Sequence, residues 1–370
     1  MRILYFTRDY TPHDYRFLNS LAEKDHQVYY LRLERRGTVL EDRPLPAKVE
    51  NIIWAGGQKP ARWQDGWNLR AGLVKVVRRL KPDIIHAGPL QTSALLSASI
   101  GFHPLVSMSW GSDILIDAER NFWWRLATRY ALTHSDVLIG DCQAVRLKAR
   151  EFGLSDDRIV TFPWGVDLDH FSPRSATAIR ARLGWEDAFV LISVRSWEAI
   201  YGVDVLVNAF IEAARRLPEL RLILLGNGSQ SAKLHHLIEL NQMDDRVFFG
   251  GQVKQSELPE YYRSADLYLS ASHSDGSSVS LMEALACAKP VLVSDIPSNR
   301  EWITDGKEGW LFPDSNIQAL ADKIYQAANQ RSSLGPMGAQ ARLLAEQRAD
   351  WDRNFQMLLK AYEKAKFSTA

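Results

Sequence analysis

Short apolar runs alternate with amphipathic stretches of helical period along the whole chain of 370 residues. The apolar runs are rich in β-branched and aromatic residues and predict strands. In the first half they lie at 3–6, 28–33, 52–54, 84–87, 105–109, 137–140 and 159–162. In the second half they lie at 190–194, 221–225, 247–249, 267–269, 291–293 and 310–312. Strands that alternate with helices predict an α/β fold, with a doubly wound, Rossmann-like parallel sheet in each half.

The length of the chain predicts two domains, because one hydrophobic core rarely serves so many residues. The segment 163–173, PWGVDLDHFSP, has a proline at each end and no sustained period, which is typical of an interdomain connection. We therefore expect an N-terminal domain at 1–168 and a C-terminal domain at 172–345. The remainder, 346–370, belongs to a longer stretch of helical spacing, from about 338 to 366. This stretch is expected to pack back on the N-terminal domain. Its apolar positions are Leu343, Leu344, Phe355, Leu358, Leu359 and Tyr362.

Composition adds little beyond excluding some classes of partner. A net charge of +1 with 24% charged residues gives no basis for a nucleic-acid partner and favours small ligands. Cys142 and Cys287 lie in apolar surroundings and are expected to be buried thiols in a reducing compartment. The first apolar run is too short for a signal peptide and no later run approaches transmembrane length. These features predict a cytoplasmic protein.

The most informative stretch is 270–312, where Asp275 lies in a Gly/Ser loop eight positions before Glu283. The loop is expected to open a helix, so that its backbone N–H groups and the helix dipole suit a diphosphate. Glu283 suits the vicinal hydroxyls of a ribose. An acidic loop residue and a surface glutamate are the simpler alternative. The strand and polar loop that follow put the pair at a strand end, which favours a nucleotide-sugar site.

The same stretch carries a family pattern, with Ala288 at a position where glycine is usual. The matching residues are Glu283, Ala284, Ala286, Pro290, Val291, Ser294, Asp295, Glu301, Gly306 and Gly309. In these residues the chain resembles the retaining glycosyltransferases of the GT-B fold, family 4. The resemblance implies two Rossmann-like domains facing a central cleft. It also implies sugar transfer from a nucleoside diphosphate sugar, by default a UDP-sugar, to an acceptor hydroxyl with retention of configuration and without metal or another cofactor.

Four donor-side positions carry the chemistry that the resemblance implies. Asp275 stands where the family usually has glutamate, and its reach to the sugar is shorter by about 1.5 Å, one bond. Arg195 matches the arginine that neutralises the diphosphate, whereas Tyr201 replaces the lysine that usually assists it. Glu198 matches a position that is often acidic. A phenol cannot supply the positive charge of an ammonium, so the choice of donor stays open.

Further donor-side positions are expected to line the nucleotide pocket. They are Gly226 and Gly228 in GNGS, Val253 after the strand at 247–249, and Gly276, Ser277, Ser278 and Val279 at the start of the helix. A Gly-x-Gly sequence alone is equally typical of an ordinary tight turn.

In the first half, Trp110 and Asp113 follow the strand at 105–109. Many relatives carry a histidine near Trp110, and an indole there suits stacking on a sugar or packing in the core. Asp113 suits sugar hydroxyls or the N-cap of the next helix. Tyr10, His13 and Asp14 follow the first strand, where His13 is a candidate contact or base for the acceptor and a polar surface loop is the alternative.

Other possibilities remain around this core interpretation. Asp167 and Asp169 match an Asp-x-Asp metal motif, but they lie in the connection and we do not expect them to bind metal. The basic helix at 69–81 suits an anionic membrane surface, although core packing with a solvated basic face is favoured. The acceptor stays open between a saccharide, a lipid-linked glycan and a small molecule, and the oligomeric state is open. Alternative functions are a nucleotide-sugar epimerase and a decayed nucleotide-sugar-binding protein.

Overall fold

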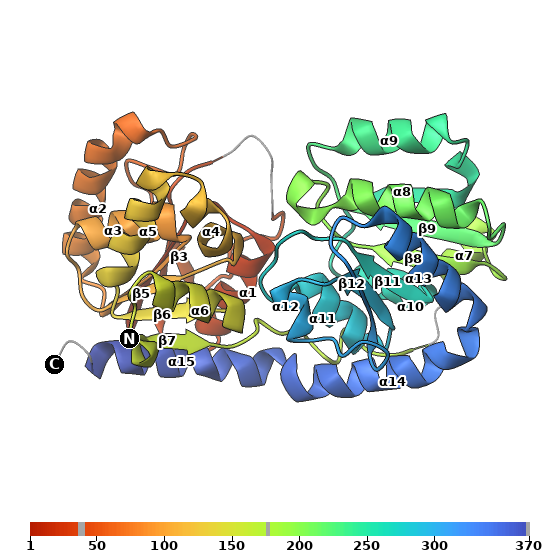
Figure 1. Ribbon diagram of the computed structural model, residues 1–370. Helices are drawn as coiled ribbons and strands as arrows, with labels where there is room; N and C mark the ends of the chain where they lie inside the picture. Colours follow the sequence, from red (N-terminus) through yellow and green to blue (C-terminus); the bar gives the residue numbers. More distant parts are fainter. Residues whose placement is uncertain (36–40, 175–177, 368–370) are drawn as a thin grey trace. The chain divides into compact units, whose positions relative to one another are not determined.

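The computed structural model describes residues 1–35, 41–174 and 178–367, and their contacts divide the chain into two units (Figure 1). The first unit comprises Met1–Phe162 and Phe355–Ala370, and the second comprises Pro163–Asn354. The chain passes from one unit to the other after Phe162 and returns within helix α15 (Trp351–Phe367). Each unit is built around its own sheet.

Among the described residues, the first unit contains a seven-stranded sheet in the order β3-β2-β1-β4-β5-β6-β7. Every neighbouring pair is parallel. The strands are β1 (Arg2–Thr7), β2 (Gln27–Arg32), β3 (Val49–Asn51), β4 (Ile84–Gly88), β5 (Leu105–Met108), β6 (Val137–Gly140) and β7 (Ile159–Thr161). The helices are α1 (Pro12–Ala22), α2 (Gly66–Leu80), α3 (Leu95–Ser99), α4 (Ser112–Leu115), α5 (Phe122–Thr133), α6 (Gln143–Glu151) and most of α15.

The described part of the second unit contains a six-stranded parallel sheet in the order β10-β9-β8-β11-β12-β13. The strands are β8 (Phe189–Ser193), β9 (Leu220–Leu225), β10 (Val247–Gly251), β11 (Leu267–Ser270), β12 (Val291–Ser294) and β13 (Gly309–Phe312). The helices are α7 (Ala178–Leu183), α8 (Val203–Ala214), α9 (Ser231–Leu240), α10 (Leu258–Ser264), α11 (Val279–Ala286), α12 (Pro297–Arg300), α13 (Ile317–Asn329) and α14 (Arg331–Arg348).

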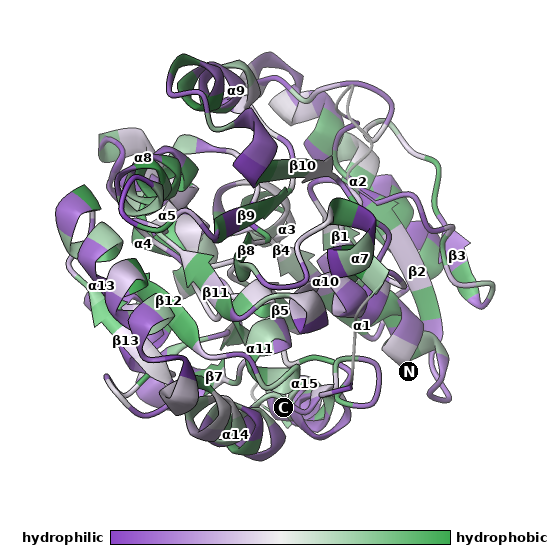
Figure 2. Ribbon diagram, turned by 90° about the vertical axis from the view of Figure 1, so that its right-hand side faces the viewer, coloured by the Kyte–Doolittle hydropathy of each residue, from purple (hydrophilic) through white to green (hydrophobic). Residues whose placement is uncertain are grey.

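Both faces of the second sheet are buried, which explains why its strands are continuously apolar (Figure 2). Along β8, Phe189 and Leu191 belong to one core cluster, while Val190 and Ile192 belong to the other. The chain order reverses between β8 and β11 in this sheet, and between β1 and β4 in the first. Ligands of doubly wound sheets bind outside the carboxyl ends of the strands at such a reversal.

The structure contains strands at or beside all of the predicted positions, and only the predicted strand at 52–54 is wrong. The strand in that region is β3, which ends at Asn51. Ile52 makes the last ladder contact, its N–H donating to the carbonyl of Tyr30 at 2.9 Å, and Ile53 is already 77% exposed. At Trp54 the indole Nε1 donates to the Arg32 carbonyl at 2.8 Å, so a side chain takes over the pairing from the backbone.

The C-terminal helical stretch is two helices rather than one, and Leu343 of the expected apolar face is 48% exposed. The break between α14 and α15 is held by the segment after β7. Val166 N–H donates to the Ala349 carbonyl at 2.7 Å, and Trp351 N–H donates back to the Val166 carbonyl at 3.1 Å. This exchange takes up backbone groups that a continuous helix would pair within itself.

Within the first unit, α15 is fixed by Tyr362, whose hydroxyl lies 2.7 Å from His86 Nδ1 of β4. Both side chains are fully buried. Burial lowers the pKa of His86 to about 3, so this contact is made by a neutral imidazole. Cys142 and Cys287 are buried, and neither forms a disulfide in the part of the chain that the structure describes. Among the described helices, none is both long and apolar enough to cross a bilayer.

Ala288 occupies a backbone conformation that favours glycine, with φ of +55° directly after α11. Its N–H donates to the Leu285 carbonyl at 3.0 Å, and the N–H of Lys289 donates to the Ala284 carbonyl at 2.9 Å. This is a Schellman motif with alanine at the left-handed position. The structure thus gives a physical reason for the glycine that the family pattern has here.

We predict that Ala288→Gly stabilises the protein by about 0.5–1 kcal/mol. Relief of the left-handed strain, worth roughly 1–2 kcal/mol, exceeds the extra entropy that glycine adds to the unfolded chain. Ala339→Gly, at an exposed position inside α14, is the matched control and should cost about 1 kcal/mol. Calorimetric melting temperatures measure both, and a lower melting temperature for Ala288→Gly contradicts the prediction.

Candidate functional site

Loops at the carboxyl ends of β8, β9 and β10 are joined by backbone hydrogen bonds in the second unit. Gly226 N–H donates to the Gly251 carbonyl at 2.8 Å. Trp197 N–H donates to the Asn227 carbonyl at 3.0 Å, and Gln230 N–H donates to the Trp197 carbonyl at 2.9 Å. These bonds fix the loop that carries Arg195 against the loop after β9.

The two predicted glycines are required by this close approach. A Cβ at Gly226, whose φ is +138°, would lie 2.4 Å from the Arg195 carbonyl oxygen. A Cβ at Gly228 would lie 2.5 Å from the Trp197 carbonyl oxygen. Both distances are shorter than any tolerated contact, so the GNG sequence is explained by packing of one loop on the other.

Arg195 is the best-connected charged group of this region. Its Nη2 lies 2.7 Å from Asp275 Oδ2, while Nη1 donates to Ser278 Oγ at 2.7 Å and to Ser280 Oγ at 3.2 Å. The guanidinium carbon lies 4.1 Å from the centre of the Tyr201 ring. Burial works to lower the pKa of Arg195, but the charge of Asp275 and the neighbouring phenols raise it on balance. Arg195 is therefore a permanent cation.

Several buried polar atoms of this region lack a hydrogen-bond partner among the described residues, including the acceptors Asp275 Oδ2 and Gln230 Oε1, and two are N–H donors. The two donors are Nε of Arg195 and Nε1 of Trp197. A buried donor without an acceptor costs roughly 1–3 kcal/mol, so each of these two donors requires an explanation. An anion placed against Arg195 would satisfy the guanidinium.

Tyr201 contributes a ring face rather than a charge. It ends the 3-10 turn η5 (Ala199–Tyr201), which Gly202 follows at φ +55°. Burial raises the pKa of the phenol, so Tyr201 is neutral, and its contact with Arg195 is a cation–π interaction. Glu198, beside it, accepts the Ser229 N–H at 2.9 Å and also contacts the Ser229 hydroxyl. Glu198 thus holds the loop after β9 in place.

The N-terminus of α11 closes the other side of Arg195. Ser278 is its N-cap and accepts the Leu281 N–H at 3.4 Å. Asp275 Oδ1 accepts the Gly276 N–H at 3.0 Å. Ser277 Oγ accepts the indole N–H of Trp302 at 3.2 Å. Burial raises the pKa of Asp275, and Arg195 lowers it. The predicted carboxylate and the predicted arginine therefore form one largely buried ion pair, with 17% and 10% of the side chains exposed.

Glu283 is the fifth residue of α11 and is 5% exposed, so it is not a helix-surface glutamate. Its Oε2 accepts the Tyr262 hydroxyl at 2.8 Å, and its Oε1 accepts Gln255 Nε2 at 3.3 Å. Val253 and Val279 are partly buried against the same core cluster. These two donors orient the carboxylate, and a carboxylate offers about four acceptor positions on its two oxygens.

Several residues of this region were not predicted from the sequence. Ser280, Gln255, Tyr262 and Trp197 each contact a predicted residue. Ser280 lies in the first turn of α11, two residues after the N-cap Ser278, and this position is a usable signal. Gln255 and Tyr262 carry no signal, because only the folded chain brings them to Glu283.

In the first unit, the structure brings Trp110 and His13 together, with ring centres 5.2 Å apart. Asp113 has another environment. Its Oδ1 accepts the Ser109 hydroxyl at 2.6 Å and the N–H groups of Trp110 and Ile114, while Oδ2 accepts the Leu90 N–H at 3.0 Å. The N-cap of α4 is Gly111, so the N-cap alternative for Asp113 is wrong. The buried carboxyl instead holds the loop that carries Trp110.

Asp14 is 1% exposed and belongs to the first turn of α1. It forms a capping box with Thr11, whose N–H donates to Oδ2 at 2.8 Å, and its Oδ1 accepts the Tyr5 hydroxyl at 3.1 Å. Burial raises the pKa of Asp14 to about 7. Tyr10 packs on Tyr30 with ring centres 5.6 Å apart. Of the three predicted acceptor residues, Asp14 is thus part of the core.

The predicted Asp-x-Asp motif forms a turn. Asp167 Oδ1 accepts the N–H groups of Asp169 and His170, both at 2.9 Å. Within the described ranges, no cluster of three or more His, Cys, Asp or Glu residues has the arrangement of a metal site.

Family models match both halves of the chain. The model described as "Glycosyl transferases group 1" matches residues 175–365, and "Glycosyltransferase Family 4" matches residues 13–170. A D-inositol 3-phosphate glycosyltransferase of Kineococcus radiotolerans is 30% identical over 251 residues, which is 62% of this chain and 58% of that protein. The GtfA subunit of a UDP-N-acetylglucosamine–peptide N-acetylglucosaminyltransferase of Streptococcus pneumoniae is 36% identical over 152 residues, 39% of this chain and 29% of that protein. The matches thus span less than two thirds of these relatives.

Solved structures show the same fold over nearly the whole chain. HepE of Anabaena, in complex with UDP-glucose, aligns with a TM-score of 0.81 at 19% identity and covers 98% of this chain and 99% of its own. Sucrose-phosphate synthase of Thermosynechococcus elongatus aligns with a TM-score of 0.83 at 17% identity and covers 100% of both chains. The predicted GT-B fold, with two Rossmann-like sheets, is confirmed.

We predict that the stability of the first unit falls as pH rises from about 4 to about 7, in part through Asp14. In this window the folded state retains a proton on Asp14 that the unfolded chain has released, so folding becomes less favourable by up to about 1.4 kcal/mol per pH unit. Asp14→Asn cannot titrate. The melting temperature of the unchanged protein should fall relative to that of Asp14→Asn as pH rises across this window, and a constant difference contradicts the prediction.

Proposed function

The chain belongs to the glycosyl transferases group 1 family, and we propose that it transfers a sugar from a UDP-sugar to an acceptor hydroxyl with retention of configuration. The observation that carries the proposal is the buried guanidinium of Arg195, held at the N-terminus of α11 with its Nε unsatisfied.

The diphosphate of the donor binds between Arg195 and the first turn of α11. Arg195 is already oriented by two serine hydroxyls and the Tyr201 ring, so its charge needs no reorganisation as the leaving group gains negative charge. The cation–π contact limits the movement of the guanidinium. Tyr201 therefore supports the arginine in place of the second cation that the family pattern has.

Glu283 binds the ribose of the nucleoside through its remaining acceptor sites. Tyr262 and Gln255 fix its carboxylate. The backbone near Gly251 and Val253 meets the base. Related structures support uridine, since HepE was solved with UDP-glucose and the pneumococcal GtfA with UDP and GlcNAc.

Asp275 fixes the transferred sugar. It lies against the charge that holds the diphosphate, and the sugar is attached to that diphosphate. In the reaction, a bond forms between the acceptor oxygen and the anomeric carbon, and the bond from that carbon to the diphosphate oxygen breaks. The acceptor proton passes to the released diphosphate. Positive charge develops on the sugar in such a transition state, and the carboxylate stabilises it.

The first unit binds the acceptor, with Trp110 and His13 as the contact surface. Their rings already lie together, and the buried Asp113 holds the Trp110 loop rigidly. A catalytically decayed nucleotide-sugar-binding protein is the second candidate, favoured by the replacement of a lysine by Tyr201. An epimerase is excluded if the donor alone stays unchanged by NMR.

We predict that Glu283→Gln weakens UDP binding roughly 10- to 100-fold, because a hydrogen bond to a charged group is worth about 1.5–3 kcal/mol. Isothermal calorimetry with UDP, GDP and ADP measures the affinity and the preference for the base. Glu239→Gln, at an exposed position of α9, is the matched control and should bind as the unchanged protein does. Equal UDP affinities for the two variants would mean that Glu283 does not bind the nucleotide.

We predict that Asp275→Asn lowers turnover on the order of 100-fold, while UDP affinity is retained or increases because Arg195 loses its competing carboxylate. Asp322→Asn, an exposed aspartate of α13, is the control. Turnover is followed with a panel of UDP-sugars and acceptors, and NMR of the product gives the anomeric configuration. Parallel losses of turnover and affinity would mean that Asp275 only positions Arg195, and an active donor with inverted product contradicts retention.

A further inference from the structure

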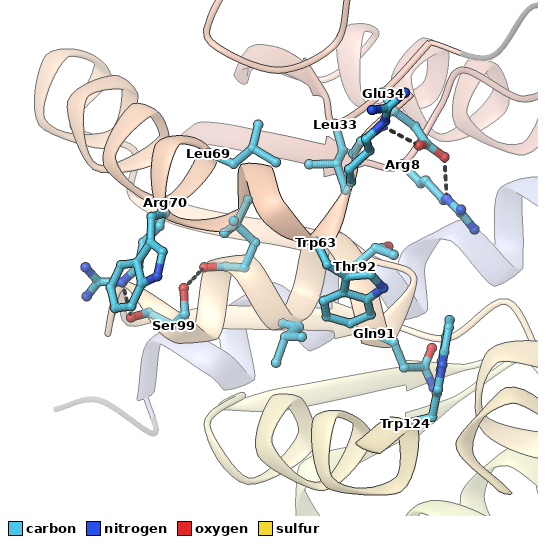
Figure 3. Close-up of a pocket in the computed structure, with 16 residues that line it drawn as sticks. Arg8, Leu33, Glu34, Trp63, Leu69, Arg70, Gln91, Thr92, Ser99 and Trp124 are labelled. Carbon is cyan, nitrogen blue, oxygen red and sulfur yellow. Dashed lines mark hydrogen bonds and ion pairs between the residues drawn. The ribbon is translucent and has the colours of Figure 1, made fainter. Parts of the chain in front are cut away.

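A cavity of about 410 Å³ lies at the carboxyl edge of the sheet in the first unit (Figure 3). Arg8 follows the end of β1, and Leu33 and Glu34 follow the end of β2. Gln91 and Thr92 come from the π-helical turn η2 (Leu90–Ala94), which follows β4. These three strands are neighbours in the order β2-β1-β4. The cavity thus occupies the edge where doubly wound sheets bind ligands.

The lining of the cavity is mainly apolar. Leu33, Leu69 and Leu96 contribute aliphatic surface, and Trp63 and Trp124 contribute rings whose centres are 6.4 Å apart at an edge-on angle. A volume of this size is within the range of small-molecule sites, about 300–1,000 Å³. It suits an apolar group.

Several polar groups of the lining are already hydrogen-bonded to protein groups. Arg8 Nε donates to Glu34 Oε1 at 2.6 Å, and Glu34 Oε2 accepts the Ala61 N–H at 2.8 Å. Gln91 Nε2 donates to the Asp113 carbonyl and to Thr128 Oγ1. A saccharide ring requires several hydrogen-bonding groups that point into the site, whereas this cavity offers chiefly apolar contact.

Exposed aromatic side chains border the cavity. Trp63 and Trp67, which line it, are 76% and 81% exposed. On α5, next to Trp124, the exposed residues are Phe122 at 69% and Trp123 at 74%. Aromatic rings this exposed are costly in water and are typical of surfaces that meet a lipid headgroup layer.

The helices at the cavity carry bases and no acids. α2 contains Arg70, Lys75, Arg78 and Arg79, all exposed, and α5 contains Arg125 and Arg129. The apolar residues Leu69, Leu73 and Val76 of α2 are buried in the core, as the favoured interpretation of this helix predicted. Its apolar face is therefore not available to a membrane, but the basic face and the neighbouring rings are. Basic residues beside indole rings match an anionic lipid surface.

We propose that this cavity binds the apolar chain of a lipid with an anionic headgroup, and that this lipid is the acceptor. The rings of Trp63, Trp67, Phe122 and Trp123 lie in the headgroup layer, and the bases of α2 contact the anionic surface. The inference rests on the proposed function for its acceptor role, but lipid binding and UDP binding are separate measurements on separate units.

The binding test uses dodecyl phosphate below its micelle concentration, with inorganic phosphate and uncharged dodecyl maltoside as comparison ligands, followed by calorimetry. We expect dodecyl phosphate to bind, inorganic phosphate not to bind detectably, and the maltoside to bind at least 10-fold more weakly. Leu96→Trp, which fills the cavity from a half-buried position, should weaken dodecyl phosphate binding at least 10-fold and leave UDP binding unchanged. Retained dodecyl phosphate binding in Leu96→Trp overturns the proposal.

The surface test is sedimentation with phosphatidylcholine vesicles, with and without phosphatidylglycerol. The unchanged protein should sediment only with the anionic vesicles, and the double variant Trp63→Ala/Trp67→Ala should lose most of this binding. Phe367→Ala removes an equally exposed ring elsewhere and is the control. Both tryptophans are exposed, so the double variant Trp63→Ala/Trp67→Ala should fold. It therefore tests the proposal even if Leu96→Trp does not fold.

Three outcomes contradict the inference. UDP binding without dodecyl phosphate binding overturns it and leaves the proposed function intact, whereas lipid binding without UDP binding overturns the proposed function and the acceptor role. A dimer in light scattering that the double tryptophan variant dissociates would assign the rings to a second copy of this chain.

Discussion

The largely buried pair of Arg195 and Asp275 is the interaction on which the second unit's candidate site depends. Taking both charges out of water is expensive, and their attraction repays it only when the remaining donors and acceptors are satisfied. Here Ser278, Ser280 and the Tyr201 ring complete much of the guanidinium environment, and the Nε atom has no hydrogen-bond partner among the described residues. Because most of its neighbours are in place, the guanidinium is stable in this position without a ligand. An anionic ligand would still add a hydrogen bond at Nε.

The loops that build this site are fixed by backbone geometry rather than by side-chain packing alone. Gly226 and Gly228 allow two loops to touch, and Ala288 ends α11 in a conformation that glycine would adopt more easily. The protein accepts strain at the end of the helix whose beginning carries the site. The other unit contains a different kind of surface, with paired polar groups inside an apolar cavity and exposed rings beside it.

The strands could be predicted because their signals are local, and so could the closeness of Asp275 to the start of α11. Buried parallel strands are continuous apolar runs, and the Asp275 loop and α11 lie within one short stretch. The failure at 52–54 arose because an apolar run continued past the last ladder bond, with Ile53 turned to solvent. The structural roles of Asp14 and Asp113 were not predicted, because the residue type alone does not distinguish a buried, hydrogen-bonded carboxyl from an exposed one. Residues of five separate segments line the cavity, so no local sequence pattern predicts it.

The most direct test of the account is the Nε–H resonance of Arg195 in arginine-labelled protein, assigned by its absence in Arg195→Lys. The account predicts that UDP gives this N–H an acceptor, so that its signal moves downfield and its exchange with water slows. If UDP binds and the Arg195 signal does not change, Arg195 is not the group that holds the diphosphate, and the proposed site is wrong.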